Sequence, residues 1–281
     1  MRVHAFVLRG FCLVAIGMGA VGCSSAPSYR DDQIVESIAK ICTTEYQFDV
    51  SVRKVGHTVA LHLRHPGILE RTGGQIRLTS IANQILGDVI ESIHRVTLSS
   101  EHPDGFYIIL VSDPSVPDTY LTIVRYLDDV RRVNAQSITP TEFFSRTIFE
   151  LQHIQAPEIN FDQIIINDIR MEDFLSWQLA HRIQDRLADL SHSHDGLPAA
   201  NVGQCIGGFH EGEFVFTLNI TPQPDKPFDD AAIRKVFQKA SEVVAQVLTS
   251  YRFDHFDTIR FVHPSSGRNV LLPKTQLELF R

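Results

Sequence analysis

The periodicity of apolar residues constrains the fold of this chain most, because the same pattern occurs twice. Apolar residues recur at helical spacing over 34–41, 81–96, 174–190 and 233–247. Alternation of apolar and polar residues, typical of hairpin strands, covers 48–63, 106–124, 202–218 and 259–272. Each half therefore has the order helix, hairpin, helix, hairpin. We predict an α+β fold of two tandem two-layer α/β sandwiches, each with helices on one face of an antiparallel sheet.

The chain of 281 residues is long enough for two domains of ordinary size. Thr139 and Glu142 have the spacing of a capping box, which predicts a short helix that continues to Leu151 and ends at Pro157. This apolar connector is expected to pack against the rest of the protein and not to form a free linker. The two halves are therefore expected to share a rigid interface. The predicted organisation is a signal peptide at 1–22, a tether at 23–30, a first α+β domain at 31–135, a connector at 136–168 and a second α+β domain at 169–281.

The first residues have the features of an export signal. Arg2 and Arg9 provide a positive start, and the apolar run 11–22 is too short to span a bilayer. The run ends in Ala20, Val21 and Gly22, directly before Cys23. This motif resembles the lipobox of bacterial lipoproteins, although Ala20 stands where the family more often has Leu. The resemblance implies cleavage before Cys23, a diacylglyceryl group on its sulfur and a palmitate-type acyl chain on its new N-terminus. The alternative is an ordinary secretory signal.

The lipoprotein resemblance also implies a location. Ser24 stands where Asp would imply inner-membrane retention, so we expect the periplasmic face of the outer membrane, or the plasma membrane in a Gram-positive host. The tether Ser24–Arg30 reaches at most about 25 Å. Loss of the leader removes two arginines and no acid, which changes the formal net charge from −7 to −9. This acidic balance argues against a nucleic-acid partner.

Four cysteines are too few for a disulfide scaffold. Cys12 leaves with the leader and Cys23 is the predicted anchor, so Cys42 and Cys205 remain to fold. Two interpretations are open for this last pair. In an oxidising periplasm they form a disulfide between the halves, or both are buried free thiols.

No catalytic residue is predicted, because the sequence lacks the spacing of a nucleophile elbow, a zinc-protease helix or a phosphate-binding loop. His192, His194 and Asp195 are weak metal candidates without a visible third fixed ligand, and a polar loop is the favoured interpretation. His62 and His65 are expected on opposite faces of a strand, which weakens them as a ligand pair.

Two further features concern the surface and the interface. Asp128-Asp129 and Arg131-Arg132 follow a strand and indicate a solvated helix start, with a charged docking site as the alternative. Trp177 lies beside the apolar stripe of its helix. We expect it in the core or the domain interface rather than as a sugar-binding platform.

These observations favour a membrane-anchored lipoprotein that acts as a non-catalytic structural or protein-interaction module of the bacterial envelope. The element order is similar to that of small periplasmic BON-type modules. Partners would add a strand to a sheet edge or fill the groove between the halves. The alternatives are an envelope hydrolase, with His194, Asp195, His210 and Glu211 to test, and a lipoprotein that binds a small ligand or metal in the cleft between the domains. No cofactor is expected beyond the acyl groups on Cys23.

Overall fold

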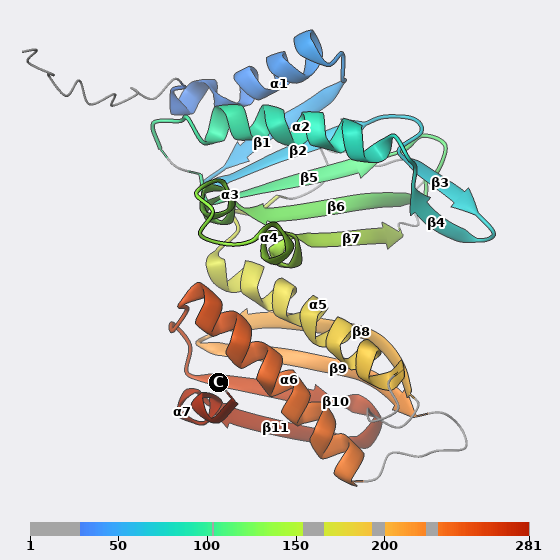
Figure 1. Ribbon diagram of the computed structural model, residues 1–281, viewed down its shortest axis with the longest axis vertical. Coiled ribbons are helices and arrows are strands. Elements are labelled where there is room, and N and C mark those ends of the chain that lie inside the picture. Colours follow the sequence, from blue (N-terminus) through green and yellow to red (C-terminus); the bar gives the residue numbers. More distant parts are fainter. Residues whose placement is uncertain (1–28, 103, 154–165, 193–199, 223–229, 281) are drawn as a thin grey trace, which may run out of the picture.

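The protein is described by a computed structural model over residues 29–102, 104–153, 166–192, 200–222 and 230–280 (Figure 1). It has an α+β fold, and its described strands form three mostly antiparallel sheets. The two larger sheets lie one in each half of the chain, and a two-stranded sheet projects from the first half.

The first half contains a five-stranded sheet with strand order β1-β2-β5-β6-β7. Its strands are β1 (Val50–Val55), β2 (Thr58–Arg64), β5 (Phe106–Ser112), β6 (Thr119–Tyr126) and β7 (Ile148–His153). Helices α1 (Ile34–Glu45) and α2 (Ala82–Thr97) lie over one face of this sheet (Figure 1). Strands β2 and β5 pair in parallel because the chain crosses through α2 between them, whereas the other neighbours are antiparallel. The prediction of a purely antiparallel sheet is therefore wrong at this pair.

The second half repeats this order. Helix α5 (Met171–His192) precedes β8 (Ala200–His210) and β9 (Glu213–Pro222), and α6 (Asp230–Tyr251) precedes β10 (Thr258–His263) and β11 (Arg268–Pro273). The sheet order is β11-β10-β9-β8, and again the strands that flank the crossover helix pair in parallel. Helices α5 and α6 lie together over one face (Figure 1). A short helix, α7 (Lys274–Leu277), follows β11.

Two segments differ from the predictions. The connector helix α4 (Pro140–Arg146) ends before Thr147, which is extended, and the chain continues as β7. The predicted helix to Leu151 is therefore wrong. The β-branched residues Thr147 and Ile148 disfavour a helix, and the chain from Ile148 to His153 pairs with the open edge of β6. The hairpin of β3 (Leu69–Thr72) and β4 (Gln75–Leu78) was not predicted.

The capping predictions succeed only in part. Thr139 accepts a hydrogen bond from the backbone N–H of Glu142, which is one of the two bonds of a capping box, whereas the Glu142 carboxylate pairs with Arg146. Asp31 and Thr79, polar residues shortly before α1 and α2, do not cap these helices. The Asp31 carboxylate instead pairs with Lys54, and the Thr79 hydroxyl donates to the carbonyl oxygen of Gly67.

The two halves have separate main cores that meet at one interface. Residues Ile38, Leu61 and Ile109 are fully buried between the first sheet and α1 and α2. The core of the second half extends beyond its own sheet and includes Phe106 and Ile148 of the first half. The halves therefore share buried apolar surface, which stabilises their relative position.

Candidate functional site

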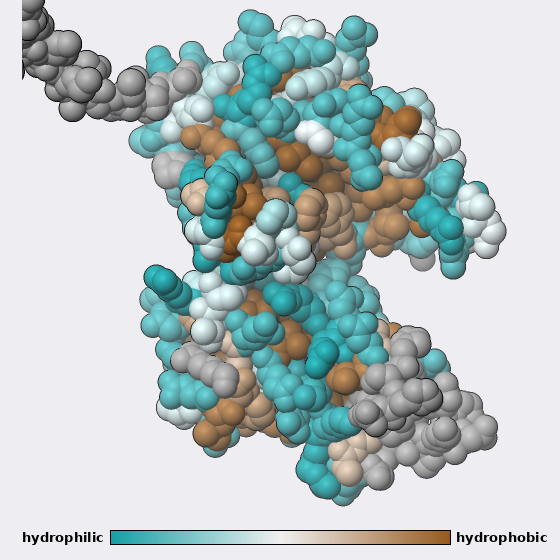
Figure 2. Space-filling view, viewed as in Figure 1, coloured by the Kyte–Doolittle hydropathy of each residue, from teal (hydrophilic) through white to brown (hydrophobic). Residues whose placement is uncertain are grey.

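A cleft of about 670 Å³ lies where the two halves meet, and the surface is hollowed between them (Figure 2). Its volume is in the range of small-molecule sites in proteins. One wall is the helix-free face of the five-stranded sheet, and the other is formed by α5 and the edge strand β8. Residues 166–169, which lead into α5, also line it.

The sheet wall is built from cross-strand rows on β5, β6 and β7. Strand alternation places every second residue on the cleft side, and the register aligns these residues across the sheet. The first row is Ile108, Val124 and Ile148, and it is entirely apolar. The second row is Leu110, Thr122 and Glu150, which changes from apolar to charged toward the edge strand. This wall therefore offers an apolar floor with polar groups at one side.

The opposite wall is a stripe along α5. Asp173, Trp177 and His181 are four residues apart and share one face of the helix, which faces the cleft. Trp177 is 41% exposed, so its expected place in the core is wrong, and its place beside the boundary of the two halves agrees with the interface alternative. The regular spacing of these three residues is the sequence signal that could have identified this wall.

Strand β8 completes the second wall because it approaches α5 closely. A Cβ atom at Gly207 would lie 2.2 Å from the carbonyl oxygen of Ser176, so only glycine fits there. Ile206, the neighbouring residue on the cleft, is 54% exposed. Strand β8 therefore packs closely against α5 at Gly207, and the adjacent Ile206 places an exposed apolar side chain at the mouth of the cleft.

The polar groups of the cleft converge on Glu150. Gln152 donates a hydrogen bond from its amide to a Glu150 carboxylate oxygen at 2.8 Å, and Gln204 of β8 reaches the other oxygen at 3.5 Å. The Gln152 amide oxygen accepts a hydrogen bond from Tyr120. The hydroxyl oxygen of Thr122 is buried and has no hydrogen-bond partner among the described residues. A buried hydroxyl without a partner is costly, which marks this wall as a place for a ligand.

The side chains that line the cleft carry three carboxylates, on Glu150, Asp168 and Asp173. No lysine or arginine lines it in the part of the chain that the structure describes. Asp168 accepts hydrogen bonds from the backbone N–H of His57 at 2.8 Å and the hydroxyl of Thr58 at 3.0 Å. These contacts fasten the start of the second half to the turn between β1 and β2. Because three carboxylates and no lysine or arginine line the described part of the cleft, its electrostatic potential is negative.

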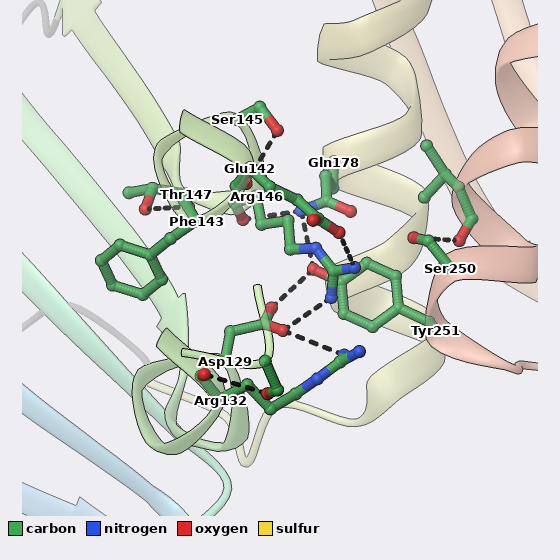
Figure 3. Close-up of polar contacts among 12 residues, drawn as sticks. Asp129, Arg132, Glu142, Phe143, Ser145, Arg146, Thr147, Gln178, Ser250 and Tyr251 are labelled. Carbon is green, nitrogen blue, oxygen red and sulfur yellow. Dashed lines mark hydrogen bonds and ion pairs between the residues drawn. The ribbon is translucent and has the colours of Figure 1, made fainter. Parts of the chain in front are cut away.

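A buried ionic network beside the cleft joins the halves (Figure 3). Asp129 of α3 (Leu127–Asn134) accepts hydrogen bonds from Arg146 of α4 at 2.7 Å and from the Tyr251 hydroxyl of α6 at 2.8 Å. Gln178 of α5 donates to the carbonyl oxygen of Arg146 and to the Tyr251 hydroxyl. The Arg146 guanidinium also lies 4.4 Å from the centre of the Tyr251 ring. This network holds the two walls of the cleft in fixed positions.

The location of Asp129 corrects the sequence interpretation. The segment 128–132 does begin a helix, but Asp129 is only 2% exposed and is not solvated. Burial raises the pKa of Asp129, while its contacts with Tyr251 and Arg146 oppose that shift. Its charged contacts are made inside the chain, with Arg146 and Arg132.

Other predicted site residues lie apart from the cleft or outside the described residues. Cys23, the lipobox residues, His194 and Asp195 fall outside them, and the side chain of His192 is not described. Within the described residues, no group of three or more His, Cys, Asp or Glu side chains could hold a metal ion. His210 and Glu211 are more than 80% exposed in the turn between β8 and β9. His62 is buried and bonded to Ser112.

The two remaining cysteines are free and buried, which agrees with the second interpretation and not with a disulfide. Cys42 lies in the core of the first half and Cys205 in the core of the second. Burial raises the pKa of both thiols, that of Cys205 to about 12. Cys205 also lines the cleft, where it acts as a small apolar surface.

None of the described helices combines the length and hydropathy needed to cross a membrane. A comparison of the chain with models of known protein families finds no matching family, and a comparison with curated proteins finds no relative. The cleft, its carboxylates and the rigid network beside it are therefore the observations from which a function can be argued.

Proposed function

We propose that this protein is a non-catalytic lipoprotein of the bacterial envelope that binds a small ligand in the cleft between its halves. The observation that carries this proposal is the cleft itself, about 670 Å³ in volume, with an apolar floor and convergent polar groups. The exposed ring of Trp177 supports it, as does the Thr122 hydroxyl, which has no hydrogen-bond partner in the part of the chain that the structure describes.

The proposed architecture is two tandem two-layer sandwiches that clasp the ligand between them. The same element order and strand order in both halves support an internal repeat. In this proposal the first and second domains are 31–135 and 169–281, and β7 of the connector extends the first sheet. The resemblance of residues 20–23 to a lipobox supports a lipid anchor, with the body close to the periplasmic face of the outer membrane.

A non-catalytic role is supported by the surroundings of two histidines, His210 and His263, that would be candidates for acid–base chemistry. His210 and Glu211 form a solvent-exposed pair on a turn, without the burial that adjusts a catalytic group. His263 contacts the hydroxyl of Ser266 through Nδ1 and the carbonyl oxygen of Ile220 through Nε2. Its ring therefore has a structural role, because it connects the turn after β10 to strand β9.

Native mass spectrometry of the full-length protein, purified from its host, tests the ligand proposal. We expect a bound small molecule in the natural protein and its loss in Ile206→Arg, because Ile206 lies at the mouth of the cleft. Leu271→Arg is the matched control, since Leu271 is equally exposed, at 54%, but lies on β11. A bound molecule that persists in Ile206→Arg, or is lost equally in both variants, would contradict the proposal.

The anchor is tested separately by metabolic labelling with a fatty acid. Cys23→Ala should abolish acyl labelling, because the sulfur that carries the diacylglyceryl group is removed. Cys42→Ala is the control, since Cys42 is buried in the first core and should leave labelling unchanged. Labelling of Cys23→Ala at the natural level would refute the lipoprotein assignment.

A second candidate function is the binding of another envelope protein at the edge strand β7. Phe144, Phe149 and Leu151 expose 61%, 43% and 45% of their surface around this edge. A partner strand added there would cover them. Crosslinking in intact envelopes should give a partner band that Phe149→Lys removes, and an unchanged band would exclude this edge.

A further inference from the structure

We propose that the ligand of the cleft is an organic cation, a protonated amine on an apolar body, with the Glu150 carboxylate as its counter-ion. This inference rests on the proposed binding function and names the class of ligand. It follows from the distribution of charge and apolar surface over the two walls of the cleft.

The first step concerns net charge. Three carboxylates and no lysine or arginine line the cleft in the described part of the chain. An anionic ligand would have to lose hydration in a site that repels it, whereas a cation gains from each carboxylate. The cleft therefore favours a positive ligand over a negative one.

The second step concerns which carboxylate is available. Asp173 already pairs with Arg170, with 3.0 Å between its oxygen and Nε of the arginine. Asp168 already receives hydrogen bonds from the turn between β1 and β2. Glu150 receives only the neutral amides of Gln152 and Gln204, and it forms no ion pair within the described residues. Neither Asp168 nor Glu150 has an ion pair within the described residues, and of the two only Glu150 belongs to the cross-strand rows of the sheet wall.

The third step concerns the rest of the ligand. Glu150 ends a cross-strand row that continues through Thr122 to Leu110, and the parallel row beside it is apolar. An ammonium group at Glu150 would place its apolar body over Ile108, Val124 and Ile148. The Thr122 hydroxyl would be a neighbouring partner, since it has no hydrogen-bond partner among the described residues. The exposed Trp177 ring on the facing wall adds a surface that attracts cations.

The experiment uses the fact that Trp177 is the only tryptophan of the chain, so its fluorescence reports on the cleft. The purified full-length protein is titrated with n-hexylammonium, 1-hexanol and hexanoate, which have the same number of carbons but different charges. Melting temperature is followed in parallel, because a ligand of the folded state raises it. We expect n-hexylammonium to bind about tenfold more tightly than 1-hexanol, and hexanoate to bind more weakly than either.

The variant Glu150→Gln identifies the counter-ion. It keeps the shape of the side chain and removes the charge, so the preference for n-hexylammonium over 1-hexanol should fall from about tenfold to about one, with 1-hexanol binding unchanged. Glu278→Gln is the control, because Glu278 is an exposed acid near the C-terminus and should preserve the preference.

The outcomes separate the two proposals. Equal binding of the amine and the alcohol, tighter binding of hexanoate, or an unchanged preference in Glu150→Gln would overturn the cation inference and leave ligand binding in the cleft standing. If none of the three probes changes Trp177 fluorescence or melting temperature at saturating concentration, the ligand-binding function falls together with the inference.

Discussion

His94 shows how a single buried titratable residue ties stability to pH. Its ring nitrogen lies 3.1 Å from the hydroxyl of Tyr107, and Arg125 donates to the same hydroxyl at 3.1 Å. Burial, with help from the nearby Arg125 charge, lowers the pKa of His94 to about 4. Burial also raises the pKa of Tyr107 to about 12. The imidazole of His94 is therefore neutral in the folded protein at neutral pH.

The unfolded chain binds a proton at this histidine below about pH 6.5, whereas the folded chain binds it only near pH 4. The contribution of His94 to the free energy of unfolding is therefore fully present above pH 6.5. It decreases by about 2–3 kcal/mol as the pH falls toward 4. In His94→Gln the free energy of unfolding should depend less steeply on pH over this range, as measured by urea unfolding. The exposed His210→Gln should retain the natural slope, and equal slopes in all three proteins would contradict the argument.

The buried thiols give a second prediction at the scale of residues. Cys42 and Cys205 are free and buried, and their raised pKa values keep them as thiols at neutral pH. Neither Cys42 nor Cys205 should react with a thiol reagent within minutes under native conditions, and both should react in denaturant. Rapid native labelling would contradict their burial, and an absence of labelling in denaturant would reveal a disulfide.

At the scale of elements, the contact between β8 and α5 depends on one glycine. Gly207→Ala would place Cβ 2.2 Å from the backbone oxygen of Ser176 and 3.0 Å from the ring of Phe216. Because a backbone atom cannot move aside cheaply, we expect a loss of about 1–3 kcal/mol in the free energy of unfolding. Gly208→Ala is the matched control, since nothing lies within 4 Å of its added Cβ. Equal stabilities of the two variants would show that the strand can move.

The elements that the sequence predicted well are those whose residues carry a local pattern. Helices α2 and α6 bury continuous apolar stripes, and the hairpin β10–β11 turns at Gly267 with a φ of 66°. The β3–β4 hairpin was missed because most of its residues are exposed and lack alternation. Strand β7 was taken for helix because its partner β6 is distant in sequence, and propensity alone does not report an open sheet edge.

The candidate site was less predictable than the fold. A groove between the halves was expected, but not its residues, because the walls come from chain segments that meet only after the halves dock. Glu150 and Gln204 are 54 positions apart, and no spacing links them. Asp129 looked like a surface acid because its partner Tyr251 follows 122 positions later. Local charge patterns do not reveal which acid will be buried.

For the molecule as a whole, the interface determines whether the halves behave as one unit. Arg146 and Asp129 are both nearly fully buried, and Tyr251 and Gln178 connect them to the second half. The second core also contains Phe106 and Ile148 of the first half. We therefore expect the natural protein to unfold in a single calorimetric transition, since the second core includes residues of the first half and the buried network joins the two halves.

Arg146→Met tests this coupling because it removes the closer of the two cations of the buried Asp129 carboxylate and leaves only Arg132, at 3.4 Å. Removal of one member of a buried pair costs about 3–5 kcal/mol, which lowers the melting temperature by roughly 10 °C in a chain of this size. Adding Asp129→Asn should recover part of that loss, because it removes the stranded charge. Arg268→Met breaks an exposed pair with Asp230 and should cost less than about 1 kcal/mol. If Arg146→Met were as mild as Arg268→Met, the network could not be what holds the two walls of the cleft in place.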